Sequence, residues 1–590
     1  MAQKAAPTNQ EIAEVLHQIA GYLEMRKVLF KPRAYQKVAQ TIESLEESVA
    51  EIYTREGAKA LMEIPGVGRG IADKIEEFLK TGRIKEYEAM KKATPVRLDE
   101  LSRIEGLGPK SIQKLYQMLG VRNLKELEAA AKSGKIAALE GFGAKSQEKI
   151  LKGIGFAEDA GKRFILGYTM PQVQAIVARL EKIGGVATVT IAGSARRRKE
   201  TIGDVDLLVV AHDAKAQKAV MDNFVAMPDV LAVAAHGPTK SSVKVRPGIN
   251  IDLRVVPKGS YGAALNYFTG SKAHNVALRQ IAVRRGWKLN EYGLYSGAAA
   301  HARERHGEKM IAGATEADIY KALGMDYIEP ELREDTGEIA AAQKHALPKL
   351  IEYGSLLGDL QTQTDWTDGA DSIETMARAA IAAGLQYFVV TDHTKRLAMT
   401  HGLDEKRLLQ QMAEIDRLNK KFAGKVKILK GSECDILKDG SLDLPDAILA
   451  KLDVVGVSVH SHFNLTRADQ TARVKRAMAN SNADILFHPT GRIINRRPPI
   501  ELDMDEIIAH AKRTGTILEV NALPERADLK DEYIRAALAA GVRLSIDSDA
   551  HAVSHFQLLD YGVAQARRGW ATKNDVINAW PMEKMLRSLK

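Results

Sequence analysis

Two aspartates one residue apart stand out in the stretch GSARRRKETIGDVDLLVV, residues 193–210 of this 590-residue chain. The run DVDLLVV predicts a β-strand whose side chains alternate, so Asp204 and Asp206 would share one face while Val205 and Leu207 enter the core. Two carboxylates on one face repel each other unless cations lie between them. Two Mg²⁺ ions about 3.5–4 Å apart, as in phosphoryl transfer, would supply those cations. The pattern therefore predicts a two-metal site.

A third carboxylate is expected from a neighbouring strand, and INIDLRVVP at 249–257 offers Asp252. The Gly193-Ser194 turn precedes the aspartate pair, and Ser194 with Arg197 can hold the phosphates of an incoming nucleotide. A Gly-Ser turn, Asp-x-Asp and a distant Asp form the nucleotidyltransferase signature. It predicts transfer of a nucleotide to a hydroxyl, but it does not say which nucleotide or which acceptor.

One glycine pattern occurs three times in the first 160 residues: IPGVGRGIADKI at 64–75, IEGLGPKSIQKL at 104–115 and LEGFGAKSQEKIL at 139–151. Glycines let the backbone turn tightly and leave amides at the next helix N-terminus free to bind a phosphate without reading bases. The motifs resemble the helix-hairpin-helix of DNA repair proteins. The predicted DNA-binding residues are Gly66, Gly68, Arg69, Gly106, Gly108, Lys110, Gly141 and Gly143.

In the second half of the chain, short apolar runs alternate with amphipathic helical stretches, which predicts a parallel (β/α) barrel. Chemistry in such barrels lies at the C-terminal ends of the strands. Several runs end in metal-ligand residue types: His393, Glu433, His460, His488, Asp549 and His551, with Asp392, His462 and Glu519 nearby. A ring of these residues predicts a multinuclear metal site suited to hydrolysing phosphate esters.

Charge separates the two halves of the chain. Residues 1–325 carry a net charge of +14 and residues 326–590 a net charge of −4. A basic front half suits a polyanion such as nucleic acid. The single cysteine, Cys434, leaves no intrachain disulfide, and neither a membrane span nor a signal-peptide core is apparent. We expect a cytosolic protein.

The stretch YFTGSKAHNVALRQIAVRRGWKLNEYGL, residues 267–294, closely resembles the thumb of family X DNA polymerases, the short gap-filling repair enzymes. The first two hairpins and the three aspartates also match. The resemblance implies that Tyr267 and Phe268 crowd the sugar 2′ position, that Asn275 bonds the minor-groove edge of the incoming base, and that Arg279 contacts the template side. It also implies nucleotide-binding roles for Arg163, Ser194, Arg197, Gly193 and Gly270. Lys272 departs from the acidic residue of the animal enzyme, so we expect altered rather than lost activity.

Lys74 raises the question of a second activity. It matches the lysine that forms a Schiff base with the sugar aldehyde at a nicked abasic site, and Tyr35 and Lys31 match as well. A lysine with a depressed pKa could attack an aldehyde. Gly70, however, replaces another lysine of that enzyme, so lyase activity stays open.

The second half resembles the PHP domain (polymerase and histidinol phosphatase) of bacterial family X polymerases, which binds three metal ions and supplies a 3′–5′ exonuclease. The first motif of active PHP domains is His-x-His followed by Asp-Gly. Here GDLQTQTDWTDG at 358–369 has Gln361 and Gln363 at the histidine positions and retains Asp368. Glutamine is the weaker ligand, so we expect one weak or empty metal position. Nuclease activity would be reduced, and its loss stays open.

The predicted fold is multidomain, with an α-helical helix-hairpin-helix region, an α/β nucleotidyltransferase palm with a thumb, and a C-terminal (β/α) PHP barrel. The predicted domains are 1–90 (lyase-like, DNA-binding), 91–163 (fingers-like), 164–260 (palm), 261–325 (thumb), 326–345 (charged linker) and 346–590 (PHP).

The sequence thus predicts a DNA polymerase of family X that fills short gaps in base excision or double-strand break repair. It would be a monomer that binds gapped or nicked DNA and deoxynucleoside triphosphates. Two Mg²⁺ or Mn²⁺ ions would occupy the polymerase site, and Mn²⁺ or Zn²⁺ would partly occupy the PHP site. Alternatives are a PHP domain that only positions DNA, a non-templated nucleotidyltransferase acting on RNA, a DNA-end-binding scaffold and a small-molecule phosphatase.

Overall fold

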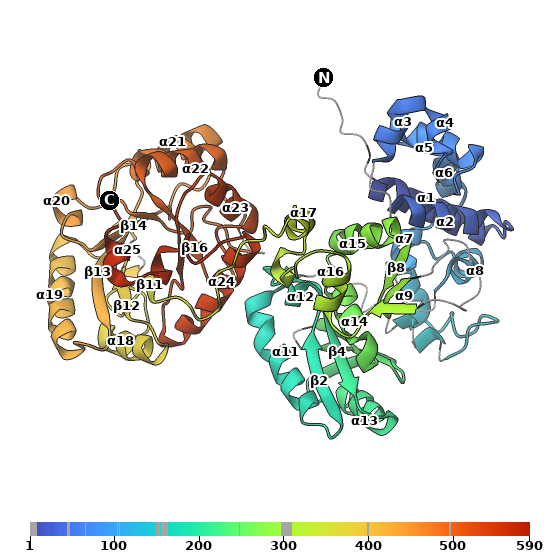
Figure 1. The fold of residues 1–590 in the computed structure, drawn as a ribbon, viewed down its shortest axis with the longest axis horizontal. Coiled ribbons are helices and arrows are strands. Elements are labelled where there is room, and N and C mark those ends of the chain that lie inside the picture. The colour runs from blue at the N-terminus through green and yellow to red at the C-terminus, as the bar shows by residue number, and fades with distance from the viewer. Residues whose placement is uncertain are drawn as a thin grey trace. The chain divides into compact units, whose positions relative to one another are not determined.

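The computed structural model describes residues 7–590 except 8, 44–47, 65, 103, 105–106, 145, 149, 152–153, 155–162, 247, 297–308, 398–399 and 495–496. The chain divides into two compact units, each assembled from separate stretches of sequence (Figure 1). The first unit comprises Met1–Arg163, Ala175–Ser194 and Gly203–Tyr327. The second comprises Phe164–Gln174, Ala195–Ile202 and Ile328–Lys590.

The front of the first unit is helical. Its helices are α1 Asn9–Met25, α2 Lys31–Glu43, α3 Val49–Glu56, α4 Ala58–Leu61, α5 Arg69–Thr81, α6 Lys85–Ala93, α7 Leu98–Leu101, α8 Pro109–Leu119 and α9 Leu124–Lys132. Local sequence sets several of their ends. Ser48 and Glu51 form a capping box at the start of α3, and Gly82 and Gly120 close α5 and α8 in the left-handed conformation.

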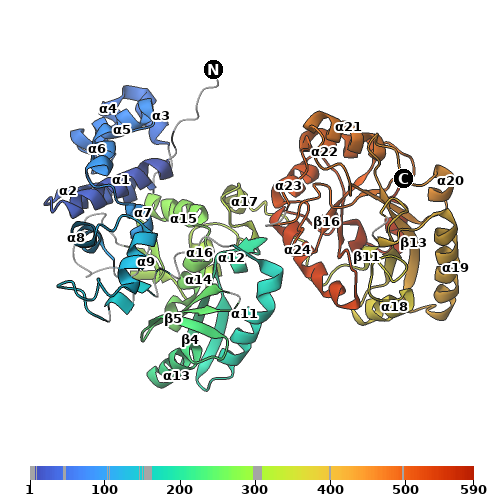
Figure 2. The same cartoon turned by 180° about the vertical axis from the view of Figure 1, so that it is seen from behind.

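A five-stranded sheet of order β2-β4-β7-β6-β5 follows in the same unit (Figure 2). Its strands are β2 Val186–Ile191, β4 Asp204–Ala211, β5 Val230–His236, β6 Lys240–Val245 and β7 Ile249–Val255. The neighbouring helices are α11 Leu166–Glu181, α12 Gly193–Arg196 and α13 Ala214–Val225. Buried residues alternate with less buried ones over the first four residues of β4 and along β7, so the aspartates lie on the less buried face of both strands.

The region predicted as a thumb combines helices with a small three-stranded sheet of order β10-β9-β8. Its elements are η1 Lys258–Ser260, α14 Tyr261–Thr269, α15 Lys272–Arg284, β8 Trp287–Asn290, β9 Gly293–Ser296, β10 Lys309–Ala312 and α16 Glu316–Ala322. Ser271 caps α15 by accepting a hydrogen bond from the His274 backbone N–H.

A seven-stranded all-parallel sheet forms the centre of the second unit, with its strands in chain order. They are β11 Gly358–Thr362, β12 Tyr387–Val390, β13 Lys427–Asp435, β14 Val454–Ser458, β15 Ile485–Leu486, β16 Ile517–Asn521 and β17 Leu544–Asp547. A bridge from Thr362 to Ala550 brings the last strand back to the first, so the sheet is nearly closed.

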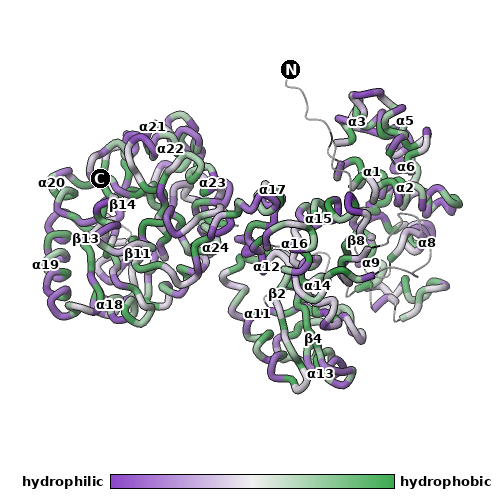
Figure 3. The backbone as a smooth tube through the Cα atoms, viewed as in Figure 1, coloured by the Kyte–Doolittle hydropathy of each residue, from purple (hydrophilic) through white to green (hydrophobic). Residues whose placement is uncertain are grey.

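Helices cover the outside of this barrel (Figure 1). They are α18 Ile373–Ala382, α19 Glu405–Lys421, α20 Asp446–Leu449, α21 Arg467–Met478, α22 Met504–Thr514, α23 Asp531–Ala539, α24 Leu559–Arg568 and α25 Met582–Leu586, with η4 Val553–Leu558 and η5 Ile577–Ala579. The outer helix α19 is largely hydrophilic (Figure 3), whereas strands β11, β12 and β14 are buried throughout. Such continuous burial is typical of parallel strands.

Two parts of the second unit differ from the sequence expectation. The stretch predicted as a loosely patterned linker forms η2 Pro330–Leu332 and α17 Glu338–Gln343 and belongs to the barrel unit, because Ile328, Leu332 and Ile339 are buried there. In addition, strand β1 Phe164–Ile165 pairs with β3 Thr201–Ile202, and both lie in this unit although the sequence predicts them as palm.

The predicted fold classes are confirmed: a helical front, an α/β sheet with a thumb, and a parallel barrel. Among the described residues, no helix has the length and apolarity needed to cross a membrane.

Candidate active sites

Strands β4 and β7 run side by side in parallel and bring the predicted aspartates together. In their register Asp206 lies directly opposite Asp252, and Asp204 lies opposite Asn250. Among the described residues, the two triplets whose ligand atoms all lie within 4.8 Å of one another are both in the barrel, so the three aspartates are more widely spaced than that. Lys240 on β6 pairs with Asp252 at 3.1 Å (Nζ to Oδ2). Sequence reasoning missed this lysine because nothing in the sequence places β6 beside β7.

The electrostatics of these aspartates favour bound cations. Burial together with the charges of Asp204 and Asp252 raises the pKa of Asp206 to about 7. Burial and Asp252 also raise the pKa of Asp204, against the opposing charge of Arg163. Carboxylates that resist ionisation because they crowd one another are stabilised by divalent cations, so the donor set fits a magnesium or manganese site.

The turn before β4 approaches the aspartates so closely that it needs a glycine. Gly193 has a φ of +64°, and a Cβ on it would lie 2.8 Å from Oδ2 of Asp206. The Ala192 N–H also donates to the Asp206 carbonyl at 2.8 Å. The Gly-Ser turn is therefore fixed against the strand that carries the carboxylates.

The predicted nucleotide residues of the thumb lie together on α14 and α15. Tyr267 and Phe268 stack edge to face with ring centroids 5.1 Å apart, and Tyr267 is 40% exposed. The Asn275 amide donates to the Tyr267 carbonyl at 2.7 Å, and Arg279 Nε donates to the Asn275 carbonyl at 3.3 Å.

Gly270 follows α14 with a positive φ of +67° and precedes the Ser271 cap, so it sets the angle between the two helices.

Two predicted phosphate ligands differ in their surroundings. Arg163 lies near the start of β4, where its Nη1 would be 4.0 Å from a Cβ on Gly203. Arg197 belongs to the second unit, and its Nε pairs with Glu334 at 3.0 Å. Sequence reasoning could not find this partner, which lies 137 residues away.

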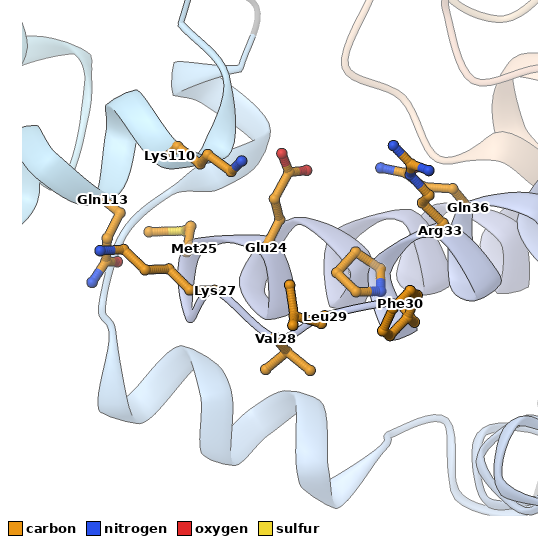
Figure 4. A pocket seen from close by; sticks show the side chains of 11 residues that line it. Glu24, Met25, Lys27, Val28, Leu29, Phe30, Arg33, Gln36, Lys110 and Gln113 are labelled. Atoms are coloured by element: carbon orange, nitrogen blue, oxygen red, sulfur yellow. The ribbon is translucent and has the colours of Figure 1, made fainter. Parts of the chain in front are cut away.

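The helical front presents basic and apolar side chains around one groove of about 810 Å³ (Figure 4). Lys110 at the start of α8 faces Glu24 of α1 across this groove. The turn between α1 and α2 exposes Leu29 and Phe30, which are 76% and 87% exposed. Cations beside exposed apolar side chains suit a sugar-phosphate backbone with unpaired bases.

The predicted hairpin glycines differ in how far the structure describes them. Gly68 and Gly108 are the N-cap residues of α5 and α8, and Gly66 and Gly141 have positive φ. Beside the third hairpin, Lys114 donates to the carbonyl of Glu140. A Cβ on Gly68, Gly108 or Gly143 would meet nothing within 4 Å, so these turns leave room for an approaching phosphate. Arg69 pairs with Asp73 at 3.0 Å, and Gly106 lies outside the described residues.

The surroundings of Lys74 do not supply the depressed pKa that attack on an aldehyde would need. Its Nζ pairs with Glu86 at 2.6 Å, and the side chain is 19% exposed. Burial alone would lower the pKa, but Glu86 and Tyr35 outweigh it and raise the pKa. Glu86, eleven residues further along the chain than the predicted motif, explains the difference. A lysine held protonated in this way is a poor nucleophile toward an aldehyde.

Glu433 is the centre of the barrel site. Its carboxylate lies 3.3 Å from His393 Nδ1, 3.1 Å from His460 Nε2 and 2.8 Å from His488 Nε2. Burial alone would raise the pKa of Glu433, yet His393 and His460 hold it well below its usual range. Ligand atoms of His393, Glu433 and His460 come within 4.8 Å of one another, which fits one metal ion.

A second group at the same end of the barrel consists of Asp368, His393 and His551. Oδ2 of Asp368 lies 3.6 Å from His393 Nε2 and 3.7 Å from His551 Nε2. Asp549 is 3.8 Å from His551 and has a φ of +50°, a strained conformation common at functional sites. This group fits a second ion.

The position of the two glutamines is different. The Gln363 amide nitrogen donates to Glu433 at 2.9 Å, and the Asn521 amide nitrogen lies 3.2 Å from Gln361 Oε1 and 3.1 Å from Asp549 Oδ2. The Asn521 oxygen accepts from the Leu523 N–H at 3.1 Å, which fixes the direction of its amide. The amide N–H groups of Gln363 and Asn521 thus face the carboxylates of Glu433 and Asp549. The position beside the two glutamines therefore does not fit a further metal ion.

Three further polar residues near the ring were not predicted. Asp435 lies 3.4 Å from His460, and Arg526 Nε lies 3.3 Å from Asp549. Asn521 ends β16. Period-two spacing from Glu433 and Glu519 could have suggested Asp435 and Asn521, whereas no sequence signal pointed to Arg526.

Four known domain families match successive parts of residues 7–334. The DNA polymerase beta palm matches residues 170–233 and the DNA polymerase beta thumb matches 264–334. A helix-hairpin-helix domain matches 7–84, and a SAM-like helix-hairpin-helix tandem matches 98–155. With the paired strands that carry three aspartates, these matches define a DNA polymerase of the nucleotidyltransferase type.

The chain belongs to family X of the DNA polymerases, in the branch that combines the polymerase with a C-terminal barrel. It is 37% identical over 585 residues to the DNA polymerase/3′-5′ exonuclease PolX of Bacillus subtilis, covering 98% of this chain and 99% of that protein. It is also 28% identical over 353 residues to rat DNA polymerase lambda, which covers 56% of this chain and 57% of the relative. Arabidopsis DNA polymerase lambda is 25% identical over 357 residues, 56% of this chain and 63% of that protein.

Proposed function

We propose that this polymerase fills short gaps in DNA during repair, using Asp204, Asp206 and Asp252 as its catalytic carboxylates. The observation that supports this most directly is the register that sets Asp206 opposite Asp252, with the pKa of Asp206 raised to about 7 by burial and its neighbours. Two Mg²⁺ or Mn²⁺ ions, when bound, would lower the charge on the α-phosphate and on the departing pyrophosphate.

Other residues of the chain would bind the nucleotide, select its sugar and accept the proton. Ser194, Arg163 and Arg197 bind the triphosphate, and Asn275 with Arg279 faces the base pair. Tyr267 and Phe268 exclude a 2′-hydroxyl, which selects deoxynucleotides. Asp252 takes up the proton of the primer 3′-hydroxyl as that oxygen attacks the α-phosphate.

DNA is the proposed partner of the helical front. The supporting observations are the N-cap glycines Gly68 and Gly108, the cations of the groove and the exposed Phe30. Gapped or nicked DNA suits this surface, because unpaired bases can stack on an exposed aromatic ring. We propose that the chain acts as a monomer in the bacterial cytoplasm at the nucleoid.

For the barrel we propose a weakened 3′–5′ exonuclease, the activity for which the Bacillus relative is named. The two histidine–carboxylate groups support two ions, with Mn²⁺ or Zn²⁺ suited to imidazole ligands. The amide contacts of Gln361 and Gln363 argue against a third ion. A barrel that only positions DNA is the second candidate, and the same amide contacts favour it.

One end-labelled primer on gapped duplex DNA tests these proposals. With Mg²⁺ or Mn²⁺ and deoxynucleotides the wild type lengthens the primer, and Asp206→Ala abolishes lengthening while DNA affinity stays within about twofold. Extension by Asp206→Ala contradicts the assignment of the site.

Without deoxynucleotides, shortening that disappears in His460→Ala supports the nuclease. Lengthening without any shortening supports the DNA-positioning barrel.

A further inference from the structure

The eight-residue segment Ala195–Ile202 joins the Gly-Ser turn to the aspartate strand, yet it belongs to the barrel unit. Ser194 and Asp204 flank it at a distance of one and two residues along the chain. The segment also carries Arg197, the proposed triphosphate ligand. Within the second unit, two groups of charged side chains contact it.

The first contact holds Arg197. Its Nε pairs with Glu334 at 3.0 Å, and Arg568 of α24 also reaches Glu334, at 3.2 Å. Arg568 Nη1 donates to the Arg197 carbonyl at 2.9 Å, and its Nη2 pairs with Asp531. One arginine of the barrel thus holds both the backbone of Arg197 and the carboxylate that orients its side chain.

The environment of this contact makes it strong. The Arg568 side chain is 2% exposed and that of Arg197 is 13% exposed. Burial alone would raise the pKa of Glu334, but Arg197, Arg568 and Lys199 outweigh it and keep the pKa below its ordinary value. Charge-assisted hydrogen bonds shielded from water constrain side chains more than exposed ion pairs do.

The second contact holds the other end of the segment. Arg492 donates to both carboxylate oxygens of Glu200, at 3.1 and 2.6 Å. Arg492 Nε also donates to the Arg526 carbonyl at 2.9 Å. The Leu166 N–H donates to the Glu200 carbonyl at 3.0 Å, beside the β1–β3 pair. The segment is therefore attached to the barrel unit at Arg197 and at Glu200.

We propose that Glu334 and Arg568 are positioning residues of the polymerase: they hold Arg197 in the orientation that binds the triphosphate and thereby raise the affinity for deoxynucleotides. The inference rests on the proposed role of Arg197. An arginine that is already oriented loses less conformational freedom when it binds a phosphate. Removing its support should therefore weaken nucleotide binding and leave the chemical step largely unchanged.

The test measures steady-state extension by the full-length protein on gapped DNA over a range of deoxynucleotide concentrations. Arg568→Ala and Glu334→Gln should each raise KM about 10-fold, the effect of one lost charge-assisted contact, with kcat changed less than about twofold. The double variant should show less than the sum of the two effects, because both residues act through Arg197. Arg568→Lys should restore part of the affinity.

Arg473→Ala is the matched control, since Arg473 is a buried arginine of the same barrel that donates to the carbonyls of Leu437 and Ser461 and not to the segment. It should leave KM within about twofold. Thermal unfolding of each variant checks folding, and Glu334→Gln still provides the test where Arg568→Ala does not fold.

Unchanged KM in both Arg568→Ala and Glu334→Gln overturns the proposal, and so does a lowered KM, which would mean that Glu334 withholds Arg197 from the triphosphate. In either case wild-type extension, lost in Asp206→Ala, leaves the proposed function in place. A wild type that extends no primer overturns the proposed function itself.

Discussion

At the scale of single residues, the chemistry of both centres depends on which groups face the carboxylates. In the polymerase site, burial and the neighbouring acids Asp204 and Asp252 raise the pKa of Asp206 against the opposing charges of Arg254 and Lys240, so the site favours cations. In the barrel the neighbours of Glu433 include three histidines and the Gln363 amide. The Glu433 carboxylate therefore contacts both the histidines that could bind a metal ion and an amide that donates a hydrogen bond.

The same Glu433 environment predicts that two substitutions create a metal position. Gln361→His with Gln363→His replaces amides by imidazoles beside Asn521 and Glu433. The double variant should retain one more tightly bound metal ion per chain after dialysis against Mn²⁺ or Zn²⁺, counted by elemental analysis. Primer shortening should rise at least about 10-fold, because a missing ligand typically costs that much.

Gln565→His is the matched control for this experiment. Gln565 is a buried glutamine of the same unit whose amide donates to the Leu529 carbonyl at 3.2 Å, away from the ring. An unchanged metal content in the double variant would mean that Asn521 still occupies the position with its amide.

At the scale of elements, η2 is fixed to helix α24. Glu331 of η2 and Arg567 of α24 pair at 2.8 Å with both side chains almost buried, and Tyr353 donates to Glu331 at 2.7 Å. Burial alone would raise the pKa of Glu331, but Arg567 and Tyr353 outweigh it and lower the pKa. The segment that follows the thumb is therefore attached to the barrel by a charge pair.

This pair predicts a pH-dependent effect of Glu331→Gln. A carboxyl whose pKa is lowered in the folded state stabilises that state above its unfolded pKa, and the stabilisation is lost as pH falls through the folded pKa. At pH 7 the variant should unfold with roughly 3 kcal/mol less free energy, since Arg567 stays buried without its counter-charge.

The difference between Glu331→Gln and wild type should shrink as pH falls below about 4.5, the unfolded pKa of glutamate. Denaturant unfolding at several pH values measures it. A difference that stays constant with pH would show that shape rather than charge carries the contact. Glu352→Gln, which changes an exposed carboxylate 3.8 Å from Lys349, is the control and should have little effect.

Local elements were the part of the molecule that the sequence predicted best. Alternation in DVDLLVV and INIDLRVV sufficed to place Asp204, Asp206 and Asp252 on one face, since strand side chains alternate whatever surrounds them. The ring at the barrel followed from the strand-end rule. Contacts between distant segments could not be predicted: Glu86 beside Lys74, Lys240 beside Asp252 and Glu334 beside Arg197 depend on tertiary packing.

At the scale of the whole molecule, the first 325 residues are basic and the remaining residues are slightly acidic. The first 325 residues carry +14 and the rest −4, and the cations Lys27, Arg33 and Lys110 line the groove of the helical front. Phosphate contacts of this kind release counterions, so they make binding depend on salt. The front half should therefore account for most of the salt dependence of DNA binding.

The triple variant Lys27→Gln, Arg33→Gln and Lys110→Gln tests that division. Its affinity for gapped DNA should fall, and the slope of log K against log salt should decrease by about 1 for each lost phosphate contact. Fluorescence anisotropy at several salt concentrations measures both. The control replaces Lys420, Lys425 and Lys438, exposed lysines of the barrel unit, and should leave the slope unchanged. Equal slopes in the two triple variants would place the DNA elsewhere.

Because the segments Phe164–Gln174 and Ala195–Ile202 belong to the barrel unit, the gene does not encode the two compact units one after the other. Gly167 lies so close to Pro524 that a Cβ would come within 2.4 Å, and Tyr168 reaches Glu525 at 3.1 Å. A gene truncated after residue 327 would encode a polymerase whose surface at these positions had lost its cover. An exchange of the gene at residue 327 would therefore not transfer the barrel unit whole, so we expect the two parts of the gene to evolve together.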